Sequence, residues 1–258
     1  MSFKDKHIFI TGAGRGLGAA FAVVLADQGA HLTLAARNTE NVKALAESIR
    51  LRTGVKPETL RLDLADSGEV TQLAETYRDE KRPVDILINN AAQWLPGSMT
   101  DNDAYSIVTT IAANVTGTLL LTRGLLPLIE ASGAGDILNV VSVSGMINTP
   151  LQGASVAYIA SKHAQTGMTD ALRQELRGRP VRVTGLYPND IKDISPLNAE
   201  WDATPKGDSR ITNRDVVEAA LFALSRPRHL TMSNIVLESD AGNFHTVGYV
   251  APKNRTPF

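Results

Sequence analysis

Two side chains that can exchange protons lie four residues apart in the segment Tyr158-Ile-Ala-Ser-Lys162. The apolar residues around them recur at helical spacing, and residues four apart in a helix lie on the same face. A lysine ammonium beside a phenol favours the phenolate, so it brings exchange of the tyrosine proton closer to neutral pH. The pair therefore predicts acid–base chemistry in a cleft. The alternative is a lysine whose stem only packs beside a core tyrosine.

Four glycines, at positions 12, 14, 16 and 18, lie in the segment Thr11-Gly-Ala-Gly-Arg-Gly-Leu-Gly18. The segment follows an expected strand and opens an expected helix. Glycine lets the backbone turn tightly and approach a pyrophosphate, whose charge the helix N-terminus favours. The segment therefore predicts a dinucleotide site, and the alternative is a flexible surface turn.

The end of the second expected strand indicates which dinucleotide binds. A site for NAD usually places a carboxylate there to bind the ribose 2′-hydroxyl. The residues Ala35-Ala-Arg-Asn38 contain no carboxylate, and the next acid is Glu40. Arg37 and Arg15 are placed to bind a 2′-phosphate instead. We therefore expect NADP(H) to be preferred over NAD(H), unless both arginines are ordinary solvated charges.

The ordered set of motifs resembles the short-chain dehydrogenase/reductase family, and the resemblance covers nearly the whole chain. Each motif alone is weak, whereas their combination in this order is highly specific. The residues that carry the resemblance are Thr11, Gly12, Gly16 and Gly18 in the glycine turn, Asp63 and Leu64 after the third expected strand, Asn89-Asn90-Ala91-Ala92 after the fourth, and the four catalytic positions Asn114, Ser142, Tyr158 and Lys162.

The resemblance implies a hydride transfer between a nicotinamide cofactor and a carbonyl or alcohol carbon. It implies that Tyr158 is the acid or base, that Ser142 hydrogen-bonds the reacting oxygen, and that Asn114 supports a water-linked proton relay. It also implies that Lys162 holds the nicotinamide ribose and lowers the pKa of the tyrosine. The residues expected to bind the cofactor are Gly12, Gly14, Arg15, Gly16, Leu17, Gly18, Arg37, Asp63, Leu64, Asn90, Ala91, Tyr158, Lys162, Pro188, Asn189 and Ile191.

The serine assignment requires an insertion in a loop. Aligning Asn139-Val-Val-Ser-Val-Ser-Gly145 with the family's strand-end pattern selects Ser142, which implies three extra residues in the loop Met146–Ala157. Ser144 is the alternative.

Three other positions depart from the family pattern. Ala92 replaces a glycine, Asn189 replaces the glycine of a Pro-Gly turn, and Asp193 replaces a threonine that usually hydrogen-bonds the carboxamide. Asparagine tolerates left-handed backbone angles better than most residues, so the turn can survive. The charge of Asp193 near the nicotinamide is unusual, and it puts the cofactor affinity in question.

Short apolar strands alternate with helical segments, which predicts a mainly parallel sheet joined by right-handed crossovers. We expect a single α/β domain over residues 1–258, a Rossmann-type doubly wound fold with about seven strands flanked by helices. The irregular segment 188–212 predicts a substrate lid. The expected strands are His7–Thr11, His31–Ala36, Leu60–Leu64, Asp85–Asn89, Asp136–Val141, Val181–Leu186 and Asn234–Glu238, and the expected helices are Leu17–Gln28, Glu40–Arg52, Ser67–Glu80, Ala104–Ile129, Val156–Leu176 and Asp215–Leu224.

Composition narrows the class of protein. The 258 residues include 26 basic and 27 acidic ones, which gives no electrostatic reason to expect nucleic acid or an anionic membrane as partner. The chain has no cysteine, which excludes disulfides and thiolate metal sites, and its five histidines show no paired ligand spacing, so we expect no metal. We see neither a signal-peptide core nor an uninterrupted apolar run of about 20 residues, and we expect a cytoplasmic protein without a membrane segment.

Two other functions stay open at this point. A 3-oxoacyl-carrier-protein reductase would carry basic residues near its entrance; Arg179 matches one such position, but Gly133 occupies the other. A catalytically silent NADP-binding sensor or scaffold would be expected to lack the tyrosine or the lysine, and this chain has both.

We expect a small carbonyl or alcohol substrate and a homodimer or homotetramer. Exposed apolar strips on the helices Ala104–Ile129 and Val156–Leu176 are the expected subunit contacts. The candidates for lining an apolar substrate pocket are Trp94, Met146, Ile147, Gln152 and Trp201.

Overall fold

Seven parallel strands form the central sheet of the computed structural model, which describes residues 3–147, 149, 153–202 and 210–239. Their order is β3-β2-β1-β4-β5-β6-β9, so the chain begins in the middle of the sheet, winds to one edge, crosses back and winds to the other. This is the expected doubly wound fold. The strands are β1 (His7–Thr11), β2 (His31–Ala36), β3 (Glu58–Arg61), β4 (Ile86–Asn89), β5 (Gly135–Val140), β6 (Val181–Pro188) and β9 (Asn234–Leu237).

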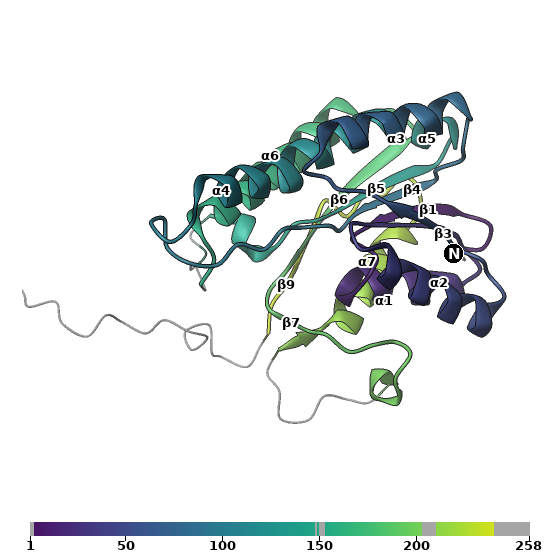
Figure 1. Ribbon diagram of the computed structural model, residues 1–258. Coiled ribbons are helices and arrows are strands. Elements are labelled where there is room, and N and C mark those ends of the chain that lie inside the picture. Colours follow the sequence, from purple (N-terminus) through teal and green to yellow (C-terminus); the bar gives the residue numbers. More distant parts are fainter. Residues whose placement is uncertain (1–2, 148, 150–152, 203–209, 240–258) are drawn as a thin grey trace, which may run out of the picture.

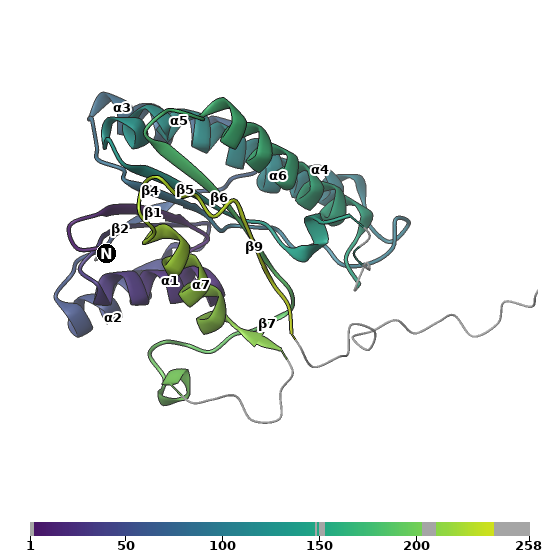
Figure 2. The ribbon, with the colours of Figure 1, turned by 180° about the vertical axis from the view of Figure 1, so that it is seen from behind.

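Helices cover both faces of the sheet (Figures 1 and 2). One layer contains α3 (Ser67–Asp79), α4 (Ala104–Ile111), α5 (Thr118–Ala131) and α6 (Val156–Glu175), and the other contains α1 (Gly16–Asp27), α2 (Thr39–Thr53) and α7 (Asn213–Leu224). Successive residues of β1 enter the two cores in turn: Ile8 and Ile10 pack on the α1 side, and Phe9 packs on the α3–α5 side. Burial of both faces explains why the strands are continuously apolar.

Side-chain caps fix where several helices begin. Asn38 caps α2 and Asp66 caps α3, each by accepting hydrogen bonds from backbone N–H groups of the first turn. Ser155 caps α6, because its hydroxyl accepts a hydrogen bond from the backbone N–H of Tyr158 at 3.1 Å. The start of the helix that carries the tyrosine–lysine pair is therefore determined by its own sequence.

The expected helix Ala104–Ile129 is not uniform. A π-helical segment, η1 (Ala112–Gly117), separates α4 from α5. At Gly117 the helix passes so close to the turn after β3 that an added Cβ would lie 2.0 Å from the carbonyl oxygen of Leu64. A wider turn at this point lets the helix pass the sheet edge and still continue.

Residues 104–131 together form a helical stretch that is long and apolar enough, by length and composition alone, to cross a bilayer. This differs from our expectation, which rested on uninterrupted apolar runs. Leu121, Leu125 and Ile129 of this stretch are buried in the core on the α3 side of the sheet. Packing within the chain therefore accounts for part of its apolar character, whereas Tyr105 and Val108 of the same stretch are exposed.

Other boundaries also differ from the expected ones. β3 is Glu58–Arg61 and not Leu60–Leu64, so Asp63 and Leu64 lie in the turn that follows it. A pair of two-residue strands, β7 (Ile191–Lys192) and β8 (Ile211–Thr212), was not expected, and it ties the two ends of the expected lid together. A short 3-10 helix, η3 (Ala199–Asp202), lies between them, whereas residues 203–209 of the lid lie outside the described residues.

Candidate active site

A cavity of about 550 Å³ lies at the carboxyl ends of β1, β2 and β4, where doubly wound sheets bind their ligands. Eleven of the residues expected to bind a cofactor line it: Gly12, Gly14, Arg15, Gly16, Leu17, Gly18, Arg37, Asp63, Leu64, Asn90 and Ala91. The other lining residues are Thr11, Ala35, Ala36, Asn38, Asn41, Leu62, Ala92, Gln93, Ala113 and Asp193.

The glycine turn is held against the end of β4. The hydroxyl of Thr11 accepts hydrogen bonds from the backbone N–H groups of Asn90 and Ala91, both at 3.0 Å. The amide of Asn90 donates in return to the backbone carbonyl of Thr11 at 3.0 Å. Gly12 has a φ of +66°, and an added Cβ would lie 2.8 Å from the Cα of Ala91, so this close approach requires glycine. The contacts fix the floor of the cavity before any ligand binds.

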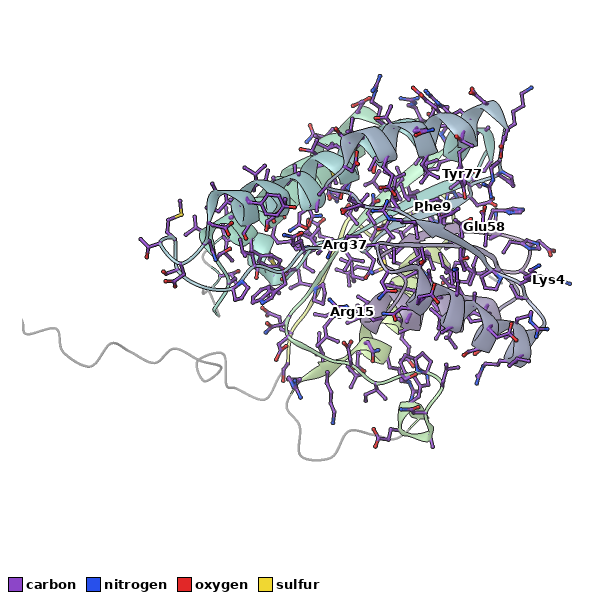
Figure 3. All side chains as sticks on the ribbon, in the orientation of Figure 1. Lys4, Phe9, Arg15, Arg37, Glu58 and Tyr77 are labelled. Atoms are coloured by element: carbon purple, nitrogen blue, oxygen red, sulfur yellow. The ribbon has the colours of Figure 1, made fainter. Side chains whose placement is uncertain are left out.

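Two arginines lie at the rim of the cavity. Arg15 precedes the first residue of α1, and Arg37 follows β2 (Figure 3). Both side chains are exposed, and within the described part of the chain Arg37 forms no salt bridge. Ala36, at the end of β2, offers no carboxylate to a ribose hydroxyl. The rim thus presents two guanidinium groups and no carboxylate at the end of β2.

Asp193 introduces a negative charge into the same cavity. A Cβ placed on Gly16 would lie 3.1 Å from the Oδ2 atom of Asp193, so the carboxylate lies directly against the glycine turn. Burial raises the pKa of Asp193 above its ordinary value, and the nearby Arg15 partly opposes this effect. The carboxylate faces the place where the helix N-terminus would favour an anion.

The tyrosine and the lysine of α6 are buried side by side. Tyr158 is 9% exposed and Lys162 is 1% exposed, and the Lys162 Nζ atom lies 5.7 Å from the centre of the Tyr158 ring. Trp94 contacts the tyrosine edge to face, with 4.6 Å between ring centres. Burial raises the pKa of Tyr158 to about 12 and lowers the pKa of Lys162 to about 7. The expected lowering of the tyrosine pKa is therefore not found here, because desolvation of the phenol dominates.

Asn114, which lies in η1, is fixed by four hydrogen bonds to residues outside that segment. Its side-chain oxygen accepts from the backbone N–H of Gln93 at 2.7 Å, and its side-chain nitrogen donates to the carbonyl of Gln93 and to the Ser161 hydroxyl. Its backbone carbonyl accepts from the side chain of Gln165 at 2.7 Å. Because Gln93 lines the cavity, Asn114 links that cavity to the tyrosine–lysine pair.

Ser142 lies directly after β5 and precedes a single 3-10 turn, η2 (Val143–Gly145). Its hydroxyl accepts a hydrogen bond from the backbone N–H of Ser144 at 3.1 Å. Ser142 is half-buried, whereas Ser144 is buried. Ser142, the serine that the family pattern selects, is therefore the more accessible of the two.

Five expected cofactor residues do not line the cavity: Tyr158, Lys162, Pro188, Asn189 and Ile191. Pro188 ends β6 and Ile191 begins β7, so both belong to strands and not to an open turn. The Oδ1 atom of Asn189 is buried without a hydrogen-bond partner among the described residues. The glycine turn and the two arginines, which do line the cavity, are the groups that fit a nicotinamide dinucleotide.

Several residues of the site were not found from the sequence. Ser161 and Gln165 complete the hydrogen bonds of Asn114 from 47 and 51 residues away. No short motif encodes such contacts. Asn38 could have been found, because an asparagine before a helix is a common cap.

Of the expected pocket residues, Trp201 packs against the α1–α7 core instead, and Gln152 lies outside the described residues.

Comparison with known proteins gives matches that cover most of the chain and agree on one protein family. A family model described as short chain dehydrogenase matches residues 6–206. An uncharacterized oxidoreductase of Staphylococcus saprophyticus is 31% identical over 237 residues, which cover 92% of this chain and 98% of that protein. A metagenomic short-chain oxidoreductase in complex with NADP has 26% identity and a TM-score of 0.77, with 92% and 98% of the two chains covered. A short chain dehydrogenase of Salmonella enterica has 27% identity and a TM-score of 0.77, with 91% and 96% covered.

Proposed function

Since this chain belongs to the short chain dehydrogenase family, we propose that it transfers a hydride between NADP(H) and a carbonyl or secondary alcohol substrate. The observation that carries the proposal is the buried pair Tyr158 and Lys162, which the hydrogen bonds of Asn114 and Gln93 connect to the glycine-lined cavity. A phenol and an ammonium that are linked by hydrogen bonds to a cavity of about 550 Å³ suit proton-coupled hydride transfer.

The cofactor, when bound, supplies or accepts the hydride. We assign its pyrophosphate to the glycine turn at the start of α1, and its 2′-phosphate to Arg15 and Arg37. Asp63 would accept from the adenine amino group, and Asn189 would accept from the carboxamide. The NADP-bound metagenomic relative supports this choice of cofactor.

The residues of this chain manage the proton. Since burial raises the pKa of Tyr158 to about 12, the hydroxyl is protonated at neutral pH and can act as an acid. In carbonyl reduction the hydride adds to the carbonyl carbon, the C=O π bond breaks, and the oxygen takes the Tyr158 proton. Ser142 would hold that oxygen by a hydrogen bond, and Lys162 would stabilise the phenolate left behind.

The surroundings of Tyr158 favour an apolar carbonyl compound. Trp94 lies on the tyrosine ring and is 53% exposed, so part of its indole faces the entrance. Met146 and Ile147 are also exposed large apolar residues. The carrier-protein alternative is less well supported, because Arg179 is already paired with Glu130 at 2.5 Å. We assign the enzyme to the cytoplasm, in keeping with its cysteine-free chain.

The proposal is tested by following NADPH consumption with a panel of apolar ketones and aldehydes, and NADP⁺ reduction with the matching alcohols. Tyr158→Phe removes the proton donor and keeps the ring, so we expect kcat to fall by roughly 10²–10⁴ with little change in NADPH affinity. Tyr105→Phe, on the exposed surface of α4, is the matched control and keeps full turnover. Wild-type turnover by Tyr158→Phe on the best substrate would remove the basis of the mechanism.

The same assay separates the two serines. Ser142→Ala is expected to lower turnover because it removes the hydrogen bond to the reacting oxygen. Ser144→Ala removes a buried hydroxyl that accepts nothing from the substrate, so it leaves turnover near the wild-type value. The reverse result would assign the role to Ser144 and reduce the expected insertion in the loop Met146–Ala157 from three residues to one.

A further inference from the structure

Gln165 joins two buried polar groups of the site. Its side-chain oxygen accepts a hydrogen bond from the Lys162 Nζ atom at 2.8 Å. Its side-chain nitrogen donates to the backbone carbonyl of Asn114 at 2.7 Å. Gln165 is 2% exposed, so both hydrogen bonds lie away from solvent. One amide thus connects α6 to the π-helical segment η1.

The orientation of this amide is fixed by its partners. An ammonium group can only donate hydrogen bonds, and a backbone carbonyl can only accept them. If the amide were rotated by half a turn, two donors would face each other at Lys162 and two acceptors would face each other at Asn114. Gln165 therefore presents its oxygen to the lysine in every low-energy arrangement of these groups.

Lys162 has few other partners that stabilise its charge. Its remaining hydrogen bond goes to the backbone carbonyl of Val140 on β5 and is long, at 3.4 Å. On α6 the ring of Tyr158, which burial keeps neutral, lies 5.7 Å from the Nζ atom, and the neighbouring His163 is exposed and hydrogen-bonds the carbonyl of Ile159. The η1 segment contributes no charged group here: its Asn114 is neutral and is connected to Lys162 through the side chain of Gln165. Among the described residues, no carboxylate forms a salt bridge with Lys162.

We infer that Gln165 is a positioning residue, which holds the Lys162 ammonium by its oxygen and ties it by its nitrogen to the backbone of Asn114. The inference rests on the proposed function, because it concerns the lysine assigned to the tyrosine and the ribose. It adds a residue that the motif Tyr-x-x-x-Lys does not contain. Removing the acceptor costs the charged lysine more than the neutral one, whereas a carboxylate in its place favours the charged form.

Two substitutions of nearly the same size move the protonation of Lys162 in opposite directions. Gln165→Leu removes the acceptor, so the pKa of Lys162 is expected to fall by about one unit from its value of about 7. Gln165→Glu keeps the shape, loses the N–H that the Asn114 carbonyl accepts, and adds a charge beside the ammonium, so the pKa of Lys162 is expected to rise by about one unit or more. A role in packing alone would not produce shifts of opposite sign.

The experiment is an NMR titration of the full chain with lysine labelled at the ε-carbon. The Lys162 signal is assigned from its loss in Lys162→Met. Gln174→Leu is the matched control, because Gln174 is an exposed glutamine on the same helix, and it leaves the midpoint unchanged. NADPH titration and the pH profile of kcat/KM are measured on the same variants, and thermal unfolding checks that each is folded.

The expected outcome is a lower midpoint for Gln165→Leu and a higher one for Gln165→Glu, with the pH limb of kcat/KM shifted in the same sense. Midpoints of both folded variants equal to that of the wild type would overturn the inference. If Gln165→Leu does not fold, the isosteric Gln165→Glu alone decides. The titration needs no substrate, so it measures the effect of Gln165 on Lys162 even if no substrate is turned over. Failure of this inference can therefore be distinguished from failure of the proposed function.

Discussion

The residues at the end of β2 define the first prediction. Ala36 cannot bind a ribose 2′-hydroxyl, while Arg15 and Arg37 line the cavity on the same rim. Charge-assisted hydrogen bonds contribute about 1.5–3 kcal/mol each, so NADPH is expected to bind at least about tenfold more tightly than NADH. Combining Ala36→Asp with Arg37→Ala should reverse the preference in fluorescence titrations with the two cofactors.

Arg61→Ala is the control for that prediction. Arg61 ends the neighbouring strand β3, pairs with Glu69 and does not line the cavity, so its removal leaves the ratio of affinities unchanged. Equal affinity of the wild type for NADPH and NADH would contradict the assignment of the 2′-phosphate to the two arginines.

Asp193 predicts a pH dependence of cofactor binding. Its pKa is raised by burial, so the carboxyl group is neutral below that raised pKa and charged above it. The charged form repels the pyrophosphate, so NADPH affinity should fall as pH rises through the pKa of Asp193. Asp193→Asn removes the charge and should raise affinity by about three- to tenfold at high pH and little at low pH.

Calorimetric titration on both sides of the transition checks this result. Asp190→Asn is the matched control, because Asp190 is exposed and lies near Arg210 at 4.0 Å, away from the cavity lining. An Asp193→Asn variant that binds NADPH more weakly than the wild type at high pH would show that the carboxylate helps to hold the cofactor.

Residues close together in the sequence were the predictable part of the site. Tyr158 and Lys162 lie on one helix, and the glycines that approach the cavity lie within one turn, so spacing alone places them. Gln165 lies on the same helix, but its role in holding Lys162 depends on a hydrogen bond to a backbone carbonyl 51 residues away. Its hydrogen bonds follow from how η1 packs on α6, which no local pattern encodes.

At the scale of elements, the main difference from expectation is the π-helical segment. Apolar periodicity over 104–129 predicted one helix, whereas the π-helical segment η1 divides it into α4 and α5. The extra residue per turn arises because Gly117 lies against Leu64, a contact between distant parts of the chain. The same holds for β3, whose length is set by pairing with β2 and not by its own apolar residues.

The crossing of α3 and α5 gives a prediction about stability. A Cβ added at Gly124 on α5 would lie 2.3 Å from the Cβ of Ala74 on α3. Gly124→Ala therefore overpacks the crossing, and we expect the free energy of unfolding to fall by about 1–3 kcal/mol in spite of the better helix propensity of alanine. Urea denaturation measures the change.

A compensating substitution tests the cause. Ala74→Gly removes the one Cβ that the new methyl group meets, so the double variant should regain part of the stability that Gly124→Ala loses. Additive losses in the double variant would show that the methyl group strains some other contact.

At the scale of the whole molecule, exposed apolar residues on α4 and α6 predict assembly. Tyr105 is 77% exposed, and Val108 and Val156 are also largely exposed although all three are large apolar side chains. We propose that two subunits bury these surfaces together as a homodimer or homotetramer. Combining Tyr105→Glu with Val108→Lys should yield a smaller species in light scattering at micromolar concentration, and a monomeric wild type would refute the proposal.

The overall topology was predictable because alternating strands and helices allow few arrangements. The parallel sheet with helices on both faces and the place of the cavity follow from that alternation and the glycine turn at the end of β1. The segment 188–212 was less predictable. Its strands β7 and β8 pair in parallel, with Ile191 opposite Ile211, although 18 residues separate them in the sequence. Two-residue strands carry too little sequence pattern to be found alone.

The central position of β1 has a consequence for how the protein is made. Of the seven strands of the sheet, β1 is synthesised before the others and can pair with β2 once β2 has followed it, but its other neighbour, β4, begins only at Ile86. Until that residue emerges, the nascent chain presents an unpaired apolar strand edge, which is the kind of surface that aggregates or recruits chaperones. β4, β5 and β6 in turn present the same kind of edge until their own next neighbours emerge, so the vulnerable period lasts until β9 completes the sheet.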